Sequence, residues 1–242
     1  MKRGLVIIPT YNESENIEKI INAVLSKSEQ LEVLVIDDNS SDNTAEIVEN
    51  MMKKNNKIHI IKRPRKMGLG TAYVSGFGYA LENDYDFVFE MDADFSHDPN
   101  DLPRFIALLD KYDLIIGSRY INGVSVVNWP MKRLLLSYFA CVFARIVTGV
   151  PVKDLTSGFK CYSRRALEKV NWQKFKVDGY GFQIQSVYGV FHAGLSIKEI
   201  PIIFVERRAG ISKMSKKIIW EAFWLVWKLR LMSLLNKKWL CK

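Results

Sequence analysis

Two aspartates separated by a single residue, Asp92 and Asp94, follow a short apolar run and are the first candidates for chemistry in the chain. Two carboxylates at one strand end can share a divalent cation, and such hard oxygen ligands suit Mg²⁺ or Mn²⁺. A metal there would neutralise charge on a phosphate-bearing leaving group. The same spacing is also common in solvated loops, so its meaning depends on the residues around it. His97, in the turn before Asp98-Pro99, is predicted to be structural and to have no catalytic role.

An aromatic ring and several carboxylates follow two other apolar runs, in Pro9-Thr-Tyr-Asn-Glu13 and Asp37-Asp-Asn-Ser-Ser-Asp42. Tyr11 can stack on a planar base, and Glu13 and Asp38 can accept hydrogen bonds from ring nitrogens or sugar hydroxyls. Helix capping is the structural alternative, and we expect it to operate as well, at Asn12, Ser14 or Asn39. Capping does not require tandem acids, so the two segments together predict a site for a base and a ribose.

Positive side chains follow further apolar runs. The stretch Arg63-Pro-Arg-Lys66-Met-Gly-Leu-Gly70 places cations beside a glycine pair that opens a helical segment, which suits phosphate binding. The pair lacks the third glycine of a dinucleotide fingerprint and follows the third strand rather than the first, which excludes a dehydrogenase site. Arg119 and Arg207 are predicted to bind anions through their planar donor forks, assisted by Ser212 and Lys213. A surface ion pair is the alternative for each.

The elements that must position these side chains alternate in type through about residue 120. Short β-branched runs predict strands at residues 5–8, 31–36, 58–61, 87–91 and 114–116, and segments of helical period predict helices at residues 17–25, 45–52 and 71–81. This alternation predicts an α/β fold with a mostly parallel sheet covered by helices. Ligands bind outside the carboxyl ends of such strands, where the polar segments lie.

The C-terminal half contains two apolar helical segments. Residues 130–150 could form a core helix or an interfacial one. From Ser215 onward, aromatic and aliphatic residues recur every three or four positions among lysines and arginines, which predicts an amphipathic helix on a membrane surface. A helix packed on the domain is the alternative for its first two turns, although the basic tail favours the membrane. We predict a nucleotide-binding domain at residues 1–213 and a membrane-associating helix and tail at residues 214–242.

Composition limits the possible classes of protein. The 242 residues, 48% of them hydrophobic, suffice for one core. The net charge of +9 attracts anions, which include nucleic acid, lipid headgroups and phosphorylated substrates. Three cysteines without a CxxC pair argue against a disulfide framework or a zinc site and favour a reducing compartment. Neither a signal peptide nor an apolar run of about 20 residues is evident, so any membrane attachment is predicted to be peripheral.

In their order, these segments resemble the inverting nucleotide-diphospho-sugar transferases of glycosyltransferase family 2, and within it the dolichol-phosphate (polyprenol-phosphate) mannose synthases. The resemblance spans nearly the whole chain. It rests on the joint order of Ile8-Pro-Thr-Tyr-Asn-Glu13, Asp37-Asp-Asn-Ser, Lys66-Met-Gly-Leu-Gly70, Asp92-Ala-Asp94, Gly117-Ser-Arg-Tyr120, Thr156-Ser-Gly-Phe159, Gly179-Tyr-Gly-Phe-Gln183 and Ser212-Lys213.

The resemblance implies a GT-A fold, with helices on both faces of the sheet and a C-terminal amphipathic helix. It implies that a group of residues surrounds the nucleotide, namely Pro9, Tyr11, Glu13, Ile36, Asp38, Lys66 and Asp92. It places Mg²⁺ or Mn²⁺ on Asp92 and Asp94, with Ser96 completing the metal site. It also implies that the phosphates of the donor and of the lipid acceptor contact Arg119, Arg207, Ser212 and Lys213.

The implied activity is transfer of mannose from GDP-mannose to dolichyl or polyprenyl phosphate, with inversion, on the cytoplasmic face of a membrane. The residues expected to be catalytic are Asp94, Arg119 and Arg207. Two departures from the pattern are Asn43, where relatives commonly carry glycine, and Gln185, where an acid is frequent. A phosphate acceptor is substantially ionised near neutrality, its second pKa being about 6, so we expect activity without a base.

Other interpretations stay open at this point. The same fold could use UDP-glucose or another nucleotide sugar, or a polysaccharide acceptor, and an anchoring subunit could be needed. The +9 charge would also suit a nucleic-acid-binding protein, although no binding motif supports one and we expect no nucleic-acid partner. An inactive membrane-associated scaffold could keep the fold, but the intact acidic and basic loops argue against it.

Overall fold

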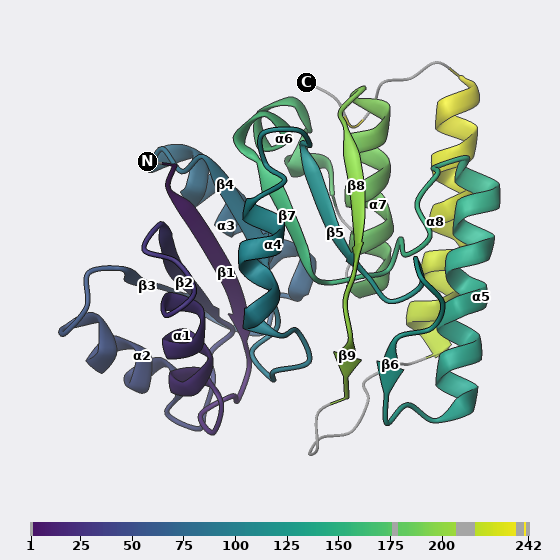
Figure 1. The fold of residues 1–242 in the computed structure, drawn as a ribbon. Coiled ribbons are helices and arrows are strands. Elements are labelled where there is room, and N and C mark those ends of the chain that lie inside the picture. The colour runs from purple at the N-terminus through teal and green to yellow at the C-terminus, as the bar shows by residue number, and fades with distance from the viewer. Residues whose placement is uncertain (1, 176–178, 207–215, 236–239, 241–242) are drawn as a thin grey trace.

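A seven-stranded sheet forms the centre of the protein in the computed structural model, which describes residues 2–175, 179–206, 216–235 and 240 (Figure 1). The strand order is β3-β2-β1-β4-β7-β5-β8. The strands are β1 (Gly4–Thr10), β2 (Leu31–Asp37), β3 (Ile58–Lys62), β4 (Phe87–Glu90), β5 (Leu114–Ser118), β7 (Lys160–Ser163) and β8 (Ile197–Pro201). All neighbours are parallel except that β7 runs antiparallel to β4 and β5. The mostly parallel sheet and its five expected strands are confirmed.

Helices cover both faces of this sheet because successive strand residues point to opposite sides. Leu5 and Ile7 of β1 enter one apolar core, and Val6 and Ile8 enter the other. The Leu5 side is covered by α3 (Leu69–Glu82), α6 (Arg164–Lys169) and α7 (Gly179–His192). The Val6 side is covered by α1 (Ile17–Leu25), α2 (Thr44–Met52) and α4 (Leu102–Ile106). The near-continuous apolar strands follow from burial on both faces.

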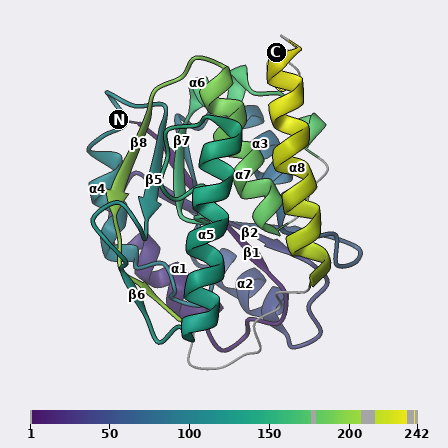
Figure 2. The same cartoon turned by 90° about the vertical axis from the view of Figure 1, so that its right-hand side faces the viewer.

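Two long helices, α5 (Met131–Thr148) and α8 (Lys216–Leu234), lie beside each other beyond α7 (Figures 1 and 2). Phe143 of α5 stacks on Phe223 of α8 with ring centroids 5.2 Å apart. The Tyr188 hydroxyl of α7 donates to the Leu229 carbonyl of α8 at 2.8 Å. The predicted amphipathic C-terminal helix is therefore present, and one of its faces packs on the domain. Among the described residues, no helix is long and apolar enough to cross a membrane.

A short second sheet and a glycine complete the framework around α5. Strands β6 (Val126–Val127) and β9 (Phe204–Val205) pair in parallel just before α5 and just after β8. At the far end, α5 stops at Gly149, whose φ of 74° is the left-handed conformation that ends many helices. The chain then continues into the segment that carries Asp154, whose Oδ1 lies 3.6 Å from Cys141 Sγ of α5.

Candidate active site at the strand ends

The carboxyl ends of three neighbouring strands bring the predicted site residues to one edge of the sheet. In the pairing of β1 with β2, Thr10 lies opposite Asp37, and in the pairing of β1 with β4, Ile7 lies opposite Glu90. The segments that begin at Tyr11, Asp38 and Met91 therefore leave the sheet side by side. This juxtaposition is the one expected for ligand binding in a parallel sheet.

The loops after β1 and β2 are joined by hydrogen bonds, and here the prediction of helix capping is wrong. The Asn12 amide donates to Ser40 Oγ, and the Ser41 amide donates to Asn12 Oδ1, each at 2.9 Å. The Ser14 amide donates to Asp42 Oδ2 at 3.0 Å. The N-caps of α1 and α2 are Asn16 and Asn43, and neither forms a side-chain capping bond. Asn12 and Ser14 act between loops because a neighbouring loop offers partners that the helix end does not.

Asp42 and Asn43 fix the turn into α2. Burial alone would raise the pKa of Asp42, but hydrogen bonds from Thr44 and Ser14 lower it to about 2. Asn43 has a φ of 68°, a left-handed conformation that asparagine tolerates better than most residues other than glycine. The departure from glycine at this position is thus accommodated without a change of turn.

Asp38 forms a buried ion pair with Arg63, whose side chains are 9% and 6% exposed. Asp38 Oδ2 also accepts the Met67 amide at 3.2 Å, and Arg63 donates to the Gly68 carbonyl at 2.9 Å. Position 68 requires a glycine because the backbone φ there, at the start of α3, is 96°. Arg63 is one of the cations predicted to suit a phosphate. In the structure it instead stabilises the conformation of the glycine loop. The exposed cations of this loop are Arg65 and Lys66.

Tyr11 and Lys66, two of the predicted nucleotide contacts, come together in space. The Lys66 ammonium lies 4.2 Å from the centre of the Tyr11 ring, which is 39% exposed. An aromatic face beside a cation can receive a base and a phosphate. Pro9 and Glu13 are half-buried at the same strand end. Ile36 is different, because it is fully buried in the core on the α3 side and presents no side-chain surface to the site.

The turn after β4 carries the predicted metal ligands. Asp92 and Asp94 are half-buried, and Asp94 Oδ1 accepts the Ser96 amide at 3.0 Å. Phe95, which lies between Asp94 and Ser96, has a φ of 59°, which is uncommon for a residue with a large side chain. Ser96 is 2% exposed, and its Oγ has no hydrogen-bond partner among the described residues. Two carboxylates and an unsatisfied buried hydroxyl fit a hard divalent cation whose other ligands are phosphate oxygens and water.

The described residues contain no group of three or more His, Cys, Asp or Glu side chains arranged to hold a metal. A cation in this turn would therefore depend on the ligands that arrive with the substrate, as is usual for Mg²⁺ with phosphates. His97 closes the turn. Its Nδ1 accepts the Asp92 amide at 3.1 Å, and burial lowers the pKa of His97 to about 4.

Arg119 is held by a buried carboxylate that the sequence did not reveal. Its backbone amide, Nε and Nη2 donate to Asp154 at 3.0, 2.7 and 2.7 Å, and Nη2 also donates to Thr156 at 2.7 Å. Arg119 is 4% exposed and Asp154 is fully buried. Although burial opposes both charges, each partner stabilises the other, which raises the pKa of Arg119 and lowers that of Asp154. Among the described residues, no hydrogen bond uses Arg119 Nη1.

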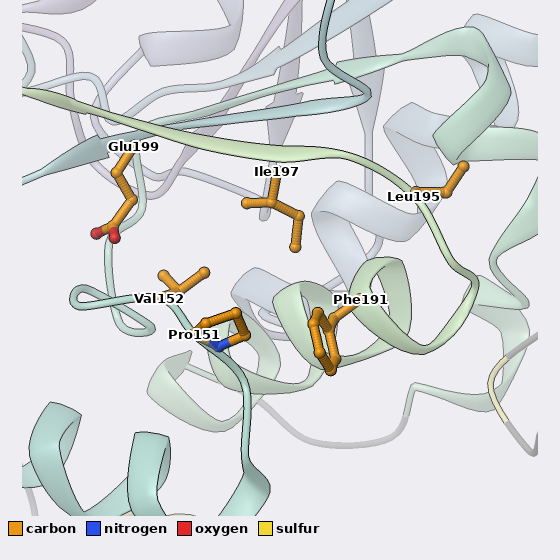
Figure 3. A pocket seen from close by; sticks show the side chains of 6 residues that line it. All are labelled: Pro151, Val152, Phe191, Leu195, Ile197 and Glu199. Carbon is orange, nitrogen blue, oxygen red and sulfur yellow. The ribbon is translucent and has the colours of Figure 1, made fainter.

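Glu199 of β8 holds the segment that carries Asp154. Its carboxylate accepts the amides of Lys153 and Asp154 at 2.8 and 2.9 Å. Glu199 also lines a cavity of about 180 Å³, together with Pro151, Val152, Phe191, Leu195 and Ile197 (Figure 3). Apart from Glu199 the lining residues are of apolar types, and the cavity lies beside β8, away from the strand ends of β1, β2 and β4. We assign it no part in the site.

A fully buried polar layer begins at Glu90, the last residue of β4 before the turn that carries the predicted metal ligands. Lys160 of β7 is opposite Glu90 of β4 in the sheet, with 3.7 Å between Nζ and Oε2. Lys160 also donates to Gln183 of α7 and to Ser186 at 3.2 Å. Burial lowers the pKa of Lys160 to about 8 and raises that of Glu90. Gln185, the departure from the family pattern, is 1% exposed within the same helix.

Three predicted phosphate contacts, Arg207, Ser212 and Lys213, lie outside the described residues. The structure thus brings together Tyr11, Lys66 and the Asp92–Asp94 turn at one edge, and it places Arg119 behind α5, bonded to Asp154. Asp154 itself follows a proline-containing turn 35 positions after Arg119. Nothing in its local sequence distinguishes it from a solvated loop aspartate.

Comparison with known proteins identifies the family. The sequence pattern of glycosyl transferase family 2 matches residues 5–170. The chain is 42% identical over 233 residues to a polyprenol monophosphomannose synthase from Mycolicibacterium smegmatis, covering 95% of this chain and 88% of the relative. It is 39% identical over 220 residues to an undecaprenyl-phosphate mannosyltransferase from Micrococcus luteus, covering 91% and 90%.

Solved structures show the same fold. Glucosyl-3-phosphoglycerate synthase from Mycobacterium tuberculosis, solved with Mn²⁺, UDP-glucose and phosphoglyceric acid, superposes with a TM-score of 0.68 at 18% identity. The match covers 93% of this chain and 80% of that one. The same enzyme in complex with UDP gives a TM-score of 0.66 at 17% identity, covering 95% and 80%. The predicted fold is confirmed, as is the prediction of a glycosyltransferase, and the chain belongs to glycosyl transferase family 2.

Proposed function

We propose that this chain transfers mannose from GDP-mannose to the phosphate of a polyprenyl lipid, with inversion at the anomeric carbon. The observation that carries the proposal is its 42% identity, over 95% of the chain, to a polyprenol monophosphomannose synthase. The second relative is also a mannosyltransferase named for a polyprenyl phosphate. The carboxylates and cations at the ends of β1, β2 and β4 support the proposal, because they suit a nucleoside diphosphate and a divalent cation.

A nucleoside diphosphate suits the arrangement of the strand-end residues. Tyr11 offers an exposed ring for the base, and Lys66 lies beside it for the diphosphate. Pro9 and Glu13 are proposed to line this site together with Asp38, which is held by Arg63, and Ile36 is proposed to support it from the core. Asp92, Asp94 and Ser96 would hold Mg²⁺ or Mn²⁺. When bound, the cation neutralises charge that develops on the leaving diphosphate.

The acceptor phosphate is assigned to the cations outside the nucleotide site. Arg119 carries a full charge held rigidly by Asp154, and Arg207, Ser212 and Lys213 are proposed to complete the grip. The lipid phosphate oxygen attacks the anomeric carbon in line with the departing nucleotide. Because this phosphate is already ionised near neutrality, no base is required. Burial of Gln185 in α7 accords with a reaction that does not use that position.

Membrane attachment is proposed for the outer faces of α5 and α8, as a peripheral contact on the cytoplasmic face. Large apolar side chains are exposed on α5 at Met131, Leu135, Leu136, Tyr138, Phe139 and Ile146, and on α8 at Phe223, Trp224, Trp227 and Leu231. Many large apolar side chains exposed on two adjoining helices favour an interaction site there. In this proposal residues 1–213 form the catalytic domain and residues 214–242 add to its attachment.

The proposal is tested by transfer of radiolabelled sugar to a polyprenyl phosphate in detergent, with Mg²⁺, Mn²⁺ or EDTA. GDP-mannose and UDP-glucose are compared as donors. Mannosyl-lipid that forms with metal and disappears with EDTA is the expected result. Transfer from UDP-glucose alone would contradict the donor, and no transfer by folded protein from either donor would contradict the acceptor. Binding of single- or double-stranded nucleic acid, with no affinity for sugar nucleotides, would instead favour a nucleic-acid-binding protein.

A further inference from the structure

His97 makes two contacts with the first residue of the proposed metal-binding turn. Its Nδ1 accepts the Asp92 backbone amide at 3.1 Å, and its Nε2 lies 4.0 Å from Asp92 Oδ2. Because Nδ1 accepts a hydrogen bond, the neutral ring carries its proton on Nε2, facing the carboxylate side of the same residue. The imidazole therefore lies next to both the backbone amide and the side-chain carboxylate of Asp92.

The ring itself is fixed by aromatic neighbours. His97 is 2% exposed and stacks on Phe159, with centroids 4.9 Å apart and an interplanar angle of 13°. The edge of Phe204 approaches it at 5.7 Å and 73°. Phe159 precedes β7, and Phe204 belongs to β9, so the imidazole is clamped between separate parts of the fold. Because its ring is fixed by these contacts, His97 can fix the position of the Asp92 amide whose hydrogen bond it accepts.

The hydrogen bond from Asp92 to His97 closes a six-residue loop that contains both carboxylates. Inside it, Asp94 Oδ1 accepts the Ser96 amide at 3.0 Å, and Phe95 adopts its left-handed φ of 59°. A strained residue persists only where the surroundings over-determine the backbone. The His97 bond and the Asp94 bond are the two closures that the described structure shows within the turn. Without the first, the Asp92 amide would lose this hydrogen bond and the turn would lose one of these two closures.

We propose that His97 is a positioning residue that holds Asp92 and Asp94 in the geometry for one divalent cation. This inference rests on the proposed metal site, and it gives His97 a role beyond the structural one predicted from the sequence. His97 does not itself ligate the cation. Partners that orient metal ligands typically contribute about 10- to 100-fold to metal affinity.

Two substitutions separate the hydrogen bond from the packing. His97→Asn places an amide oxygen where Nδ1 lies but removes the ring from Phe159. His97→Phe keeps a ring against Phe159 but removes the acceptor. Mn²⁺ is titrated into each purified variant with GDP present to supply phosphate oxygens, and the free-ion signal is followed by electron paramagnetic resonance against a titration of GDP without protein. Thermal unfolding is recorded in parallel, and His97→Gln, which lacks an acceptor at the Nδ1 position, replaces the Phe variant if that variant does not fold.

Positioning predicts that His97→Phe weakens Mn²⁺ binding about 10- to 100-fold, whereas His97→Asn stays within about threefold of wild type despite a lower melting temperature. A purely structural histidine predicts the reverse order, because the Asn variant loses more packing. Asp94→Ala is the control for the site itself. If Asp94→Ala binds Mn²⁺ as wild type does, the proposed metal site is wrong. If Asp94→Ala loses binding while His97→Phe keeps it, the site stands and the role of His97 is refuted.

Discussion

Replacing Asp154 with asparagine should destabilise the protein far more than replacing an exposed aspartate. The Asp154 carboxylate is fully buried and accepts three hydrogen bonds from Arg119, whose side chain is 5% exposed. Asp154→Asn keeps the shape but leaves the guanidinium charge buried without its counterion. Breaking such a pair typically costs about 3–5 kcal/mol. For a chain of this size that loss lowers the melting temperature by roughly 6–20 °C.

The assay is urea unfolding at neutral pH, with Asp84→Asn as a matched control. Asp84 pairs with Arg164 at 3.2 Å, but its side chain is 86% exposed, so its loss should cost at most about 1 kcal/mol. Its φ of 57° suits asparagine as well as aspartate. Replacing both charges, in Arg119→Met with Asp154→Leu, should recover much of the stability because no charge is left buried. A loss below about 1 kcal/mol for Asp154→Asn would refute the reasoning.

The same pair has a defined pH dependence. Burial would raise the pKa of Asp154, but Arg119 lowers it below its ordinary value. The folded protein therefore binds this proton less readily than the unfolded chain does. The stabilisation is fully present above the unfolded pKa of about 3.9 and is lost as the pH falls through the lower folded value. The difference in unfolding free energy between wild type and Asp154→Asn should stay constant from pH 7 to about 5 and narrow only below about 4.

Three further substitutions test other parts of the structure. Asp94→Ala should reduce sugar transfer to below about 1% of wild type without a large change in melting temperature, because it removes charge stabilisation of the leaving group; normal metal-dependent turnover would oppose the assignment. Trp224→Ser should weaken binding to anionic lipid vesicles about 10- to 100-fold, since Trp224 is 65% exposed on α8. The same variant should keep its transfer activity toward a short-chain acceptor in detergent. Unchanged vesicle binding would show that Trp224 of α8 takes no part in the membrane contact. Lys160→Met should cost about 3–5 kcal/mol by leaving Glu90 buried without its cation, and adding Glu90→Gln should restore part of this; a Lys160→Met variant as stable as wild type would show that the pair is neutral.

The sequence predicted those features of the fold that depend on local pattern. The β-branched runs mark strands, and acids or aromatic residues mark the points where strands end, so Tyr11, Asp38 and the Asp92–Asp94 turn were located correctly at one edge of the sheet. Parallel topology makes this possible, because every strand of the first half ends at the same edge. The antiparallel β7 was not predicted, since its four residues carry no sign of their direction.

The features that escaped prediction depend on partners distant in the sequence. Arg63 was interpreted as a phosphate-binding cation, but Asp38, 25 positions earlier, takes it into the interior. Asn12 and Ser14 have the composition of helix caps, yet Asn12 Oδ1 accepts the Ser41 amide, and the backbone amides of both residues donate to the loop after β2. Polar side chains of this kind satisfy whichever group the tertiary structure brings near, and the local sequence gives no information about which one that is.

The arrangement of α5 links Arg119, the proposed phosphate contact, to the proposed membrane face. On its inner side, Cys141 Sγ lies 3.6 Å from Asp154 Oδ1, and Ser137 Oγ accepts a hydrogen bond from the Tyr120 hydroxyl at 2.8 Å. On its outer side, Phe139 and Ile146 are 61% and 71% exposed. Arg119 is therefore separated from the surface that would meet lipid by about one helix diameter, roughly 10–12 Å. A phosphate attached to an apolar chain has to reach the site while its chain stays in the bilayer, and a membrane contact through α5 keeps that distance short. The same helix also contacts Tyr120 and Asp154, so the proposed membrane contact and the proposed phosphate binding would both depend on α5.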